Sequence, residues 1–147
     1  MVCGPMGPDA IRDCRAATMG KLLFVFTEFT FETGMVSEAM ADDYVHVAML
    51  TGCDGVQVPA TRIGRVRHVR KIVGDEMLII SCGVGTQTIC GQPSMRPQLG
   101  SLIAEGADYE IVGRAIYDSV ASSAPPAELA RRAKERILAS CVENPGR

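Results

Sequence analysis

The 147-residue sequence has no apolar run long enough to span a bilayer. Its longest uninterrupted apolar stretches, such as 22–26 and 77–80, fall far short of the roughly 20 residues that a membrane-spanning helix needs. The amino terminus lacks the basic leader and the long apolar segment of a secretory signal. We therefore expect no transmembrane helix and a cytoplasmic protein.

Sequence motifs for metal binding and nucleophilic catalysis are also missing. The six cysteines form no C-x-x-C pair, and no histidine stands near them at metal-ligand spacing. They are Cys3, Cys14, Cys53, Cys82, Cys90 and Cys141. We expect buried, reduced thiols and no metal site. No nucleophile lies on a strand-turn-helix elbow with a base in evident reach, which argues against Ser-His-Asp or Cys-His catalysis.

Neither sign of charge is in clear excess. The sequence has 15 Lys and Arg and 17 Asp and Glu, which gives a formal net charge of −2. This balance does not indicate a nucleic-acid or anionic-membrane partner. One predicted helix, 61–73, does have a crowded basic face formed by Arg62, Arg65, Arg67, Arg70 and Lys71. Because no aromatic residues interleave with these cations, we interpret that face as solvated.

The composition, 47% hydrophobic and 22% charged, fits one domain over residues 1–147 with one core. Short apolar runs bounded by turn residues predict strands at 1–3, 22–26, 55–58, 77–81 and 109–112. Helical patterns occupy 9–18, 37–51, 61–73 and 97–105, and a fifth opens at Pro125-Pro126. The second of these helices would bury a stripe of Met40, Tyr44, Val47 and Ala48.

This alternation of strands and helices predicts a parallel α/β architecture with right-handed crossovers. Most of the strand segments show little in/out alternation, as expected for strands that are buried on both faces. Five such units make a complete flavodoxin-like sheet but only five-eighths of a TIM barrel. Composition leaves both folds open, so the loops must distinguish them.

Two glycine-containing loops follow the fourth and fifth predicted strands. Gly83 and Gly85 would let backbone N–H groups approach a ligand closely, and Arg114, after Gly113, offers a forked donor suited to phosphate. TIM barrels hold phosphate with the loops after their last two strands. The loops therefore predict a phosphate site that includes Gly83, Val84, Gly85, Gly113 and Arg114.

Four segments together resemble orotidine 5′-phosphate decarboxylase, particularly its archaeal-type members. They are TEFT at 27–30, PATR at 59–62, ISCGVGTQ at 80–87 and ADYEIVGRAIY at 107–117. The resemblance implies the C-terminal part of a (βα)8 barrel, about five parallel βα units that correspond to barrel strands 4–8. It also implies that Gln87 and Arg114 contact a nucleotide phosphate, with Gly113 supplying backbone, and that Thr30 touches the pyrimidine edge.

Some positions depart from the family pattern. Cys82 replaces a frequent Pro, Ala60 stands where Ser is usual, Thr88-Ile89 replaces Gly-Gly, and Cys3 occupies a position that is often His. These changes affect the fine geometry of the ligand site and leave the phosphate contacts in place.

The family converts orotidine monophosphate to uridine monophosphate without metal or cofactor, using an Asp-x-Lys-x-x-Asp motif that this chain lacks. Its three lysines, Lys21, Lys71 and Lys134, fall before a strand or on helices. Glu28 is the one carboxylate at a strand's carboxyl end, and a single acid cannot replace a Lys/Asp array. We therefore assign no catalytic residue and expect the isolated chain to bind phosphate weakly without decarboxylating.

Three explanations fit a chain without the first three units: a truncated record, one half of a split enzyme, or a remodelled binding protein. The resemblance implies a nucleotide monophosphate ligand and a homodimer, or association with the missing N-terminal half. Two functional alternatives stay open. One is another phosphate-binding barrel, such as hexulose-phosphate synthase or ribulose-phosphate epimerase, although His46 and His68 fall on helices rather than at strand ends. The other is a non-enzymatic flavodoxin-like module that binds a phosphorylated ligand.

Overall fold

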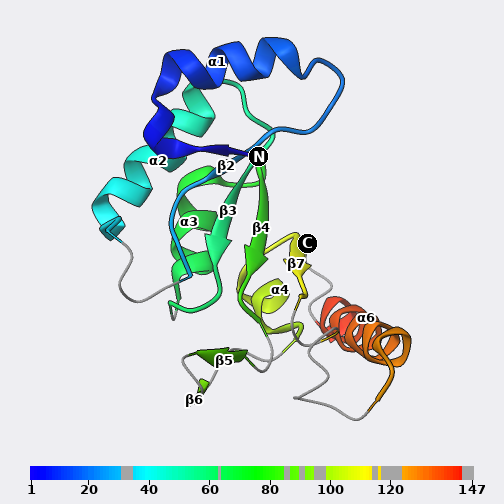
Figure 1. Cartoon of the computed structure of the whole chain (residues 1–147). Coiled ribbons are helices and arrows are strands. Elements are labelled where there is room, and N and C mark those ends of the chain that lie inside the picture. The colour runs from blue at the N-terminus through cyan, green and yellow to red at the C-terminus, as the bar shows by residue number, and fades with distance from the viewer. Residues whose placement is uncertain are drawn as a thin grey trace.

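Five parallel strands form one sheet in the order β1-β2-β3-β4-β7 (Figure 1). This computed structural model describes residues 1–30, 35–62, 64–84, 87–89, 92–94, 99–113, 116 and 124–143. The strands are β1 (Val2–Cys3), β2 (Phe24–Phe26), β3 (Gly55–Pro59), β4 (Leu78–Cys82) and β7 (Tyr109–Ile111). The five predicted strands are confirmed, and no strand end shifts by more than two residues.

Strand order distinguishes the two folds that the sequence left open. Within this sheet, neighbouring strands follow one another in sequence: β1 pairs with β2, β2 with β3, β3 with β4, and β4 with β7. A flavodoxin-like sheet has the order 2-1-3-4-5, whereas neighbouring strands of a TIM barrel follow one another in sequence. The sheet is therefore part of a (βα)8 barrel.

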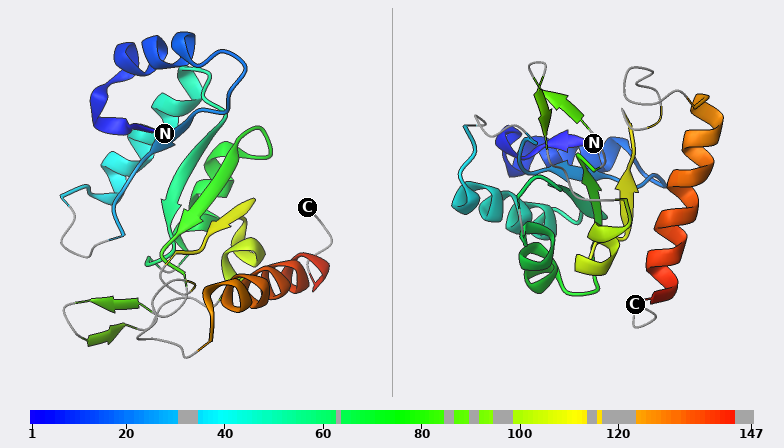
Figure 2. Two further views of the ribbon diagram at one scale, coloured as in Figure 1. Left: turned by 45° about the vertical axis from the view of Figure 1, so that its right-hand side comes forward. Right: turned by 90° about the horizontal axis from the view of Figure 1, so that it is seen from below.

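Helices connect these strands and cover one face of the sheet. They are η1 (Gly4–Met6), α1 (Pro8–Ala17), α2 (Glu38–Leu50), α3 (Arg65–Val73), α4 (Ser101–Glu105) and α6 (Pro126–Glu143). Figure 2 shows α2, α3, α4 and α6 following one another along the outer side of the sheet. In the part of the chain that the structure describes, no helix is long and apolar enough to cross a membrane.

Some helices differ from the sequence prediction in detail. α4 begins at Ser101 rather than at residue 97. α3 begins at Arg65 rather than at residue 61, because Gly64 before it has a left-handed backbone conformation (φ +73°) that a helix cannot include. α2 starts after Ser37, whose side chain caps the helix by accepting a bond from the Met40 amide. Its buried residues are Ala41, Val45 and Ala48. Of the predicted stripe, Ala48 is buried and Val47 packs against the core, whereas Met40 is 43% exposed.

The core lies between the sheet and these helices. Val25, Val56 and Ile79 stand in register on β2, β3 and β4, and all three side chains are fully buried. Burying an aliphatic side chain of this size stabilises a fold by about 1.5–3 kcal/mol. Packing on this face therefore fixes the register of the three central strands.

Ion pairs fasten the amino-terminal end of the sheet. Asp54 accepts a hydrogen bond from the Leu23 amide (2.7 Å) and lies 2.6 Å from Arg15. Asp108 accepts from the Ile79 amide (2.7 Å) and pairs with Arg70 at the end of α3 (2.5 Å). Each carboxylate thus joins a helix to the first residues of a neighbouring strand.

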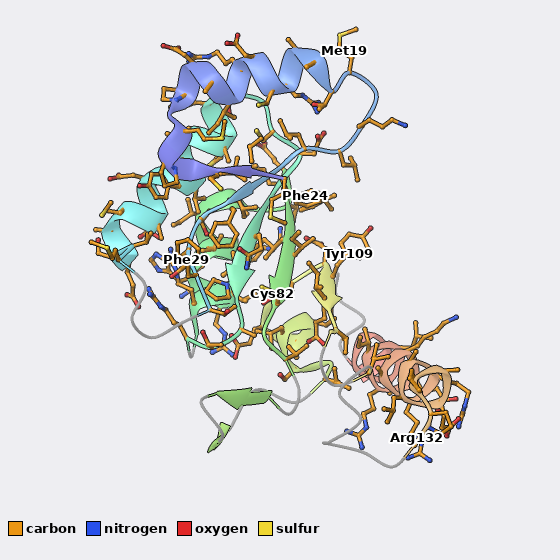
Figure 3. The ribbon with its side chains drawn as sticks, in the orientation of Figure 1. Met19, Phe24, Phe29, Cys82, Tyr109 and Arg132 are labelled. Carbon is orange, nitrogen blue, oxygen red and sulfur yellow. The ribbon has the colours of Figure 1, made fainter. Side chains whose placement is uncertain are left out.

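The opposite face of the sheet is only partly covered. Gln57, Ile80 and Tyr109 stand in register on β3, β4 and β7 and form a row across this face. On β7, Tyr109 is 56% exposed and Ile111 is 47% exposed. Figure 3 shows Tyr109 at the margin of the sheet. Among the described residues, β7 pairs with β4 on one side only. This apolar face and the free edge of β7 are what a closed barrel would cover.

We predict that the chain self-associates through this edge. Tyr109→Lys places a charge on the edge strand, which opposes edge-to-edge pairing, and should shift the protein toward the monomer in size-exclusion chromatography with light scattering. Met19→Lys is the matched control, because Met19 is 83% exposed in the turn after α1, away from the edge. A wild-type chain that is monomeric at all concentrations would contradict the prediction.

Candidate functional site

Three small residues converge where β2, β3 and β4 end. Thr30 follows β2, Thr61 follows β3 and Gly83 follows β4. The Thr61 hydroxyl donates a hydrogen bond to the Thr30 carbonyl (3.2 Å). A Cβ atom on Gly83 would lie 3.2 Å from Thr61 Cγ2 and 3.3 Å from Thr30 Cγ2, and the φ of Gly83 is +95°. Glycine is thus required here by both backbone conformation and close packing.

The structure describes some of the predicted phosphate residues. Val84, directly after Gly83, is buried, and Gly113 is half-buried just beyond β7. The Gly113 carbonyl accepts a hydrogen bond from the Ile116 amide (2.8 Å). Gly85 and Arg114 lie outside the described residues, so their predicted roles stay predictions.

Gln87 belongs to a short hairpin that the sequence analysis did not predict. Strand β5 (Gln87–Ile89) pairs in antiparallel fashion with β6 (Gln92–Ser94), and Gln87 stands opposite Ser94. The hairpin projects beyond the carboxyl ends of the main sheet (Figure 1). Only its backbone is described, so the contact of Gln87 with phosphate stays a prediction.

Gln57 and Cys82 form a polar pair on the partly covered face. Gln57 Nε2 donates to Cys82 Sγ (2.9 Å), and Gln57 is 1% exposed. No described residue bonds the Gln57 Oε1 atom. Burial raises the pKa of the Cys82 thiol despite the hydrogen bond from Gln57, so the thiol is held neutral. Figure 3 shows Cys82 near the end of β4.

A buried charge network lies beneath the converging loops. Glu28 is fully buried and pairs with Arg65 of α3 and with Arg62, whose Nη1 lies 2.7 Å from Glu28 Oε2. Arg65 also reaches Asp42 of α2 (2.7 Å), and Asp42 pairs with His68 (2.9 Å). The prediction that Arg65 lies on a solvated basic face was wrong: its side chain is 3% exposed because Glu28 and Asp42 compensate its charge.

These contacts shift the pKa values of Asp42 and Arg65. Partial burial would raise the pKa of Asp42, but hydrogen bonds from His68 and Arg65 hold that pKa below its usual value. Burial would lower the pKa of Arg65, yet its hydrogen bonds to Glu28 and Asp42 raise it. Glu28 is therefore engaged by two cations, and it is not a free acid for a bound ligand.

No described lysine lies at the carboxyl ends of the strands. Lys21 precedes β2, Lys71 is on α3 and Lys134 is on α6, as the sequence indicated. His46 and His68 lie on α2 and α3, and the described residues include no cluster of His, Cys, Asp or Glu that could hold a metal ion. The described part of the site therefore offers backbone amides and the hydroxyls of Thr30 and Thr61, and no lysine.

The cysteines differ partly from the expectation of buried thiols. Among the described residues Cys3, Cys14, Cys53 and Cys82 are all free. Cys53 is buried and Cys14 and Cys82 are half-buried, but Cys3 is exposed because β1 lies at the edge of the sheet. Cys90 and the side chain of Cys141 lie outside the described part of the chain.

The chain is similar in sequence to curated orotidine 5′-phosphate decarboxylases from archaea. The chain is 37% identical over 132 residues to the orotidine 5′-phosphate decarboxylase of Methanococcoides burtonii, covering 88% of this chain and 56% of that protein. It is 38% identical over 146 residues to the Methanosarcina barkeri enzyme, covering 95% and 59%. The chain is therefore similar, over most of its own length, to part of the orotidine 5′-phosphate decarboxylases. No family model matches the chain.

Solved structures of orotidine 5′-monophosphate decarboxylases have the same fold over the shared part. The Methanocaldococcus jannaschii protein, complexed with the inhibitor BMP, superposes with a TM-score of 0.71 at 25% identity, covering 92% of this chain and 60% of that chain. The Metallosphaera sedula protein superposes with a TM-score of 0.66 at 26% identity. The chain thus spans between half and two thirds of the length of these decarboxylases.

The raised pKa of Cys82 predicts slow alkylation. Because the thiolate is the reactive species, iodoacetamide at neutral pH should modify Cys82 more slowly than exposed Cys3, as followed by peptide mass mapping. In denaturant the two cysteines should react at similar rates, which controls for local sequence. Equal rates in the native protein would contradict the assignment.

Proposed function

We propose that this decarboxylase-like chain binds a pyrimidine nucleoside 5′-monophosphate, orotidine or uridine 5′-monophosphate, at the carboxyl ends of its strands. The observation that carries the proposal is the convergence of Thr30, Thr61 and Gly83 at one edge of the sheet. Ligands of parallel α/β proteins bind outside the carboxyl ends of the strands, and in TIM barrels the loops at this end form the active site.

The proposed site has two ends of different chemistry. Thr30, at the end of β2, would contact the pyrimidine edge. The loop that begins with Gly83 and Val84, together with Gln87, Gly113 and Arg114, would bind the phosphate through backbone N–H groups and a guanidinium. The order of the strands supports this division, because β4 and β7 are neighbours and both phosphate segments follow them.

Decarboxylation is proposed for the complete barrel rather than for this part of it. Loss of CO2 leaves a carbanion-like centre that a positioned general acid must protonate. Glu28 is committed to Arg62 and Arg65, and the described lysines lie away from the site. The groups that perform the proton transfer would have to come from units that close the sheet between β1 and β7.

Several finer expectations stay predictions. The homodimer and the cytoplasmic location inferred from the resemblance are among them, as is the single domain over residues 1–147. An epimerase-like function has no observation in its favour, since neither histidine lies at a strand end.

Nucleotide binding is testable with uridine 5′-monophosphate by isothermal titration calorimetry. Arg114→Ala should weaken binding about tenfold to a hundredfold, because a hydrogen bond to a charged group contributes about 1.5–3 kcal/mol. Arg132→Ala is the control, because Arg132 pairs with Glu128 on the exposed surface of α6 (2.7 Å). Unchanged affinity in Arg114→Ala would contradict the proposed phosphate site.

A second experiment tests the proposed lack of turnover. Purified chain mixed with orotidine 5′-monophosphate should leave the ultraviolet absorbance of the substrate unchanged, while a complete family member converts it. Turnover above background by this chain, abolished by Arg114→Ala, would refute the account of the missing proton donor.

A further inference from the structure

The buried carboxylate of Glu28 has no evident role in stability alone. A fully buried ion pair loses hydration on both sides, and apolar residues of similar size often stabilise a fold as well or better. Glu28 nevertheless stands at the carboxyl end of β2, two residues before Thr30, with no exposed surface. A buried carboxylate at this place therefore suggests a role in positioning, through its contacts with Arg62 and Arg65.

The two arginines come from different segments. Arg62 directly follows Thr61 in the segment after β3, and Arg65 is the first residue of α3. Glu28 therefore connects the segment after β2 to the segment after β3 through its ion pair with Arg62 (2.7 Å). The Thr61 hydroxyl connects the same two segments by a hydrogen bond to the Thr30 carbonyl (3.2 Å).

Further contacts fix this junction to the helix layer. Arg62 Nη2 donates to the Val36 carbonyl ahead of α2 (3.4 Å), and Arg65 Nη1 donates to Asp42 within α2 (2.7 Å). The chain on both sides of residues 31–34 is thus held by arginines that also hold Glu28.

We propose that Glu28 is a positioning residue for the nucleotide site: through Arg62 and Arg65 it sets Thr30 and Thr61 against Gly83 without touching the ligand. The inference rests on the proposed function and deepens it. Glu28 governs the end of the site that Thr30 forms. The phosphate end, which follows β4 and β7, depends on Glu28 less.

The chain contains a matched control at the other end of α3. Arg70, near the end of that helix, pairs with Asp108 at the amino-terminal end of the sheet (2.5 Å). Both pairs join a carboxylate near a strand to an arginine of α3, but only the Glu28 pair adjoins the converging loops. Asp108→Asn therefore removes the carboxylate partner of an α3 arginine at the end of the sheet away from the proposed site.

The experiment compares Glu28→Gln, Arg62→Gln, Arg62→Lys and Asp108→Asn in the full 147-residue chain. Arg62→Gln is the milder variant, because Arg65 still pairs with Glu28 in it. Binding of uridine 5′-monophosphate and of ribose 5-phosphate, which lacks the base, is measured by calorimetry. Amide hydrogen exchange of the 27–30 and 59–62 segments is followed without ligand, so that a variant too unstable to bind still reports on local order.

Glu28→Gln and Arg62→Gln should weaken uridine 5′-monophosphate binding about tenfold or more, while ribose 5-phosphate binding changes less than about twofold. Both should speed exchange in the two segments, Arg62→Lys should restore part of the affinity, and Asp108→Asn should leave the affinity unchanged. Equal losses for both ligands would indicate a merely structural role and overturn the inference. So would wild-type exchange rates in the two segments.

Failure of the proposed function gives a different result. A wild-type chain that binds neither ligand refutes nucleotide binding by this chain. The exchange data then decide separately whether Glu28 orders the two segments.

Discussion

The parallel register of β2, β3 and β4 is the constraint on which the rest of the structure depends. Val25, Val56 and Ile79 are buried in one row, so a shift of one residue would expose the core and move every loop at the carboxyl edge. In the observed register β3 and β4 end level with each other at Pro59 and Cys82, and β2 ends at Phe26, in register with Gln57. Thr30, Thr61 and Gly83 meet there as a consequence, although 53 residues separate the first from the last.

The two ends of the sheet use charge differently. At the amino-terminal end, Asp54 and Asp108 are partly exposed, and each bonds both an arginine and a strand amide. At the carboxyl end, Glu28 is fully buried, accepts a hydrogen bond from Arg65 and forms an ion pair with Arg62. An exposed pair adds little to stability, whereas loss of one partner from a buried pair is costly. The carboxyl end of the sheet, where we propose the nucleotide site, thus has the ion pairs that are more sensitive to the loss of one partner.

The sequence predicted the strands well because their apolar runs are buried on both faces and bounded by turn residues. The prediction for Arg65 was wrong because a basic residue among other basic residues is expected to be exposed. Its acidic partner Glu28 is 37 residues away in the sequence, and only the fold brings the two together. The same long-range pairing hid the role of Glu28. The β5–β6 hairpin escaped prediction because residues 87–94 have neither an alternating pattern nor a two-residue turn signal. Family motifs indicated Thr30 and Gly83, while Thr61 emerged only from its contacts with both.

We propose that the carboxyl edge of this sheet binds a nucleotide. The most direct measurement is a nuclear magnetic resonance titration of 15N-labelled chain with uridine 5′-monophosphate, with amide shifts mapped onto the structure. We predict saturable shifts at Thr30, Thr61, Gly83, Val84 and Gly113, and none at Leu23 or Asp54 on the opposite edge. Shifts confined to the amino-terminal edge, or no saturable shifts at all, would contradict the account.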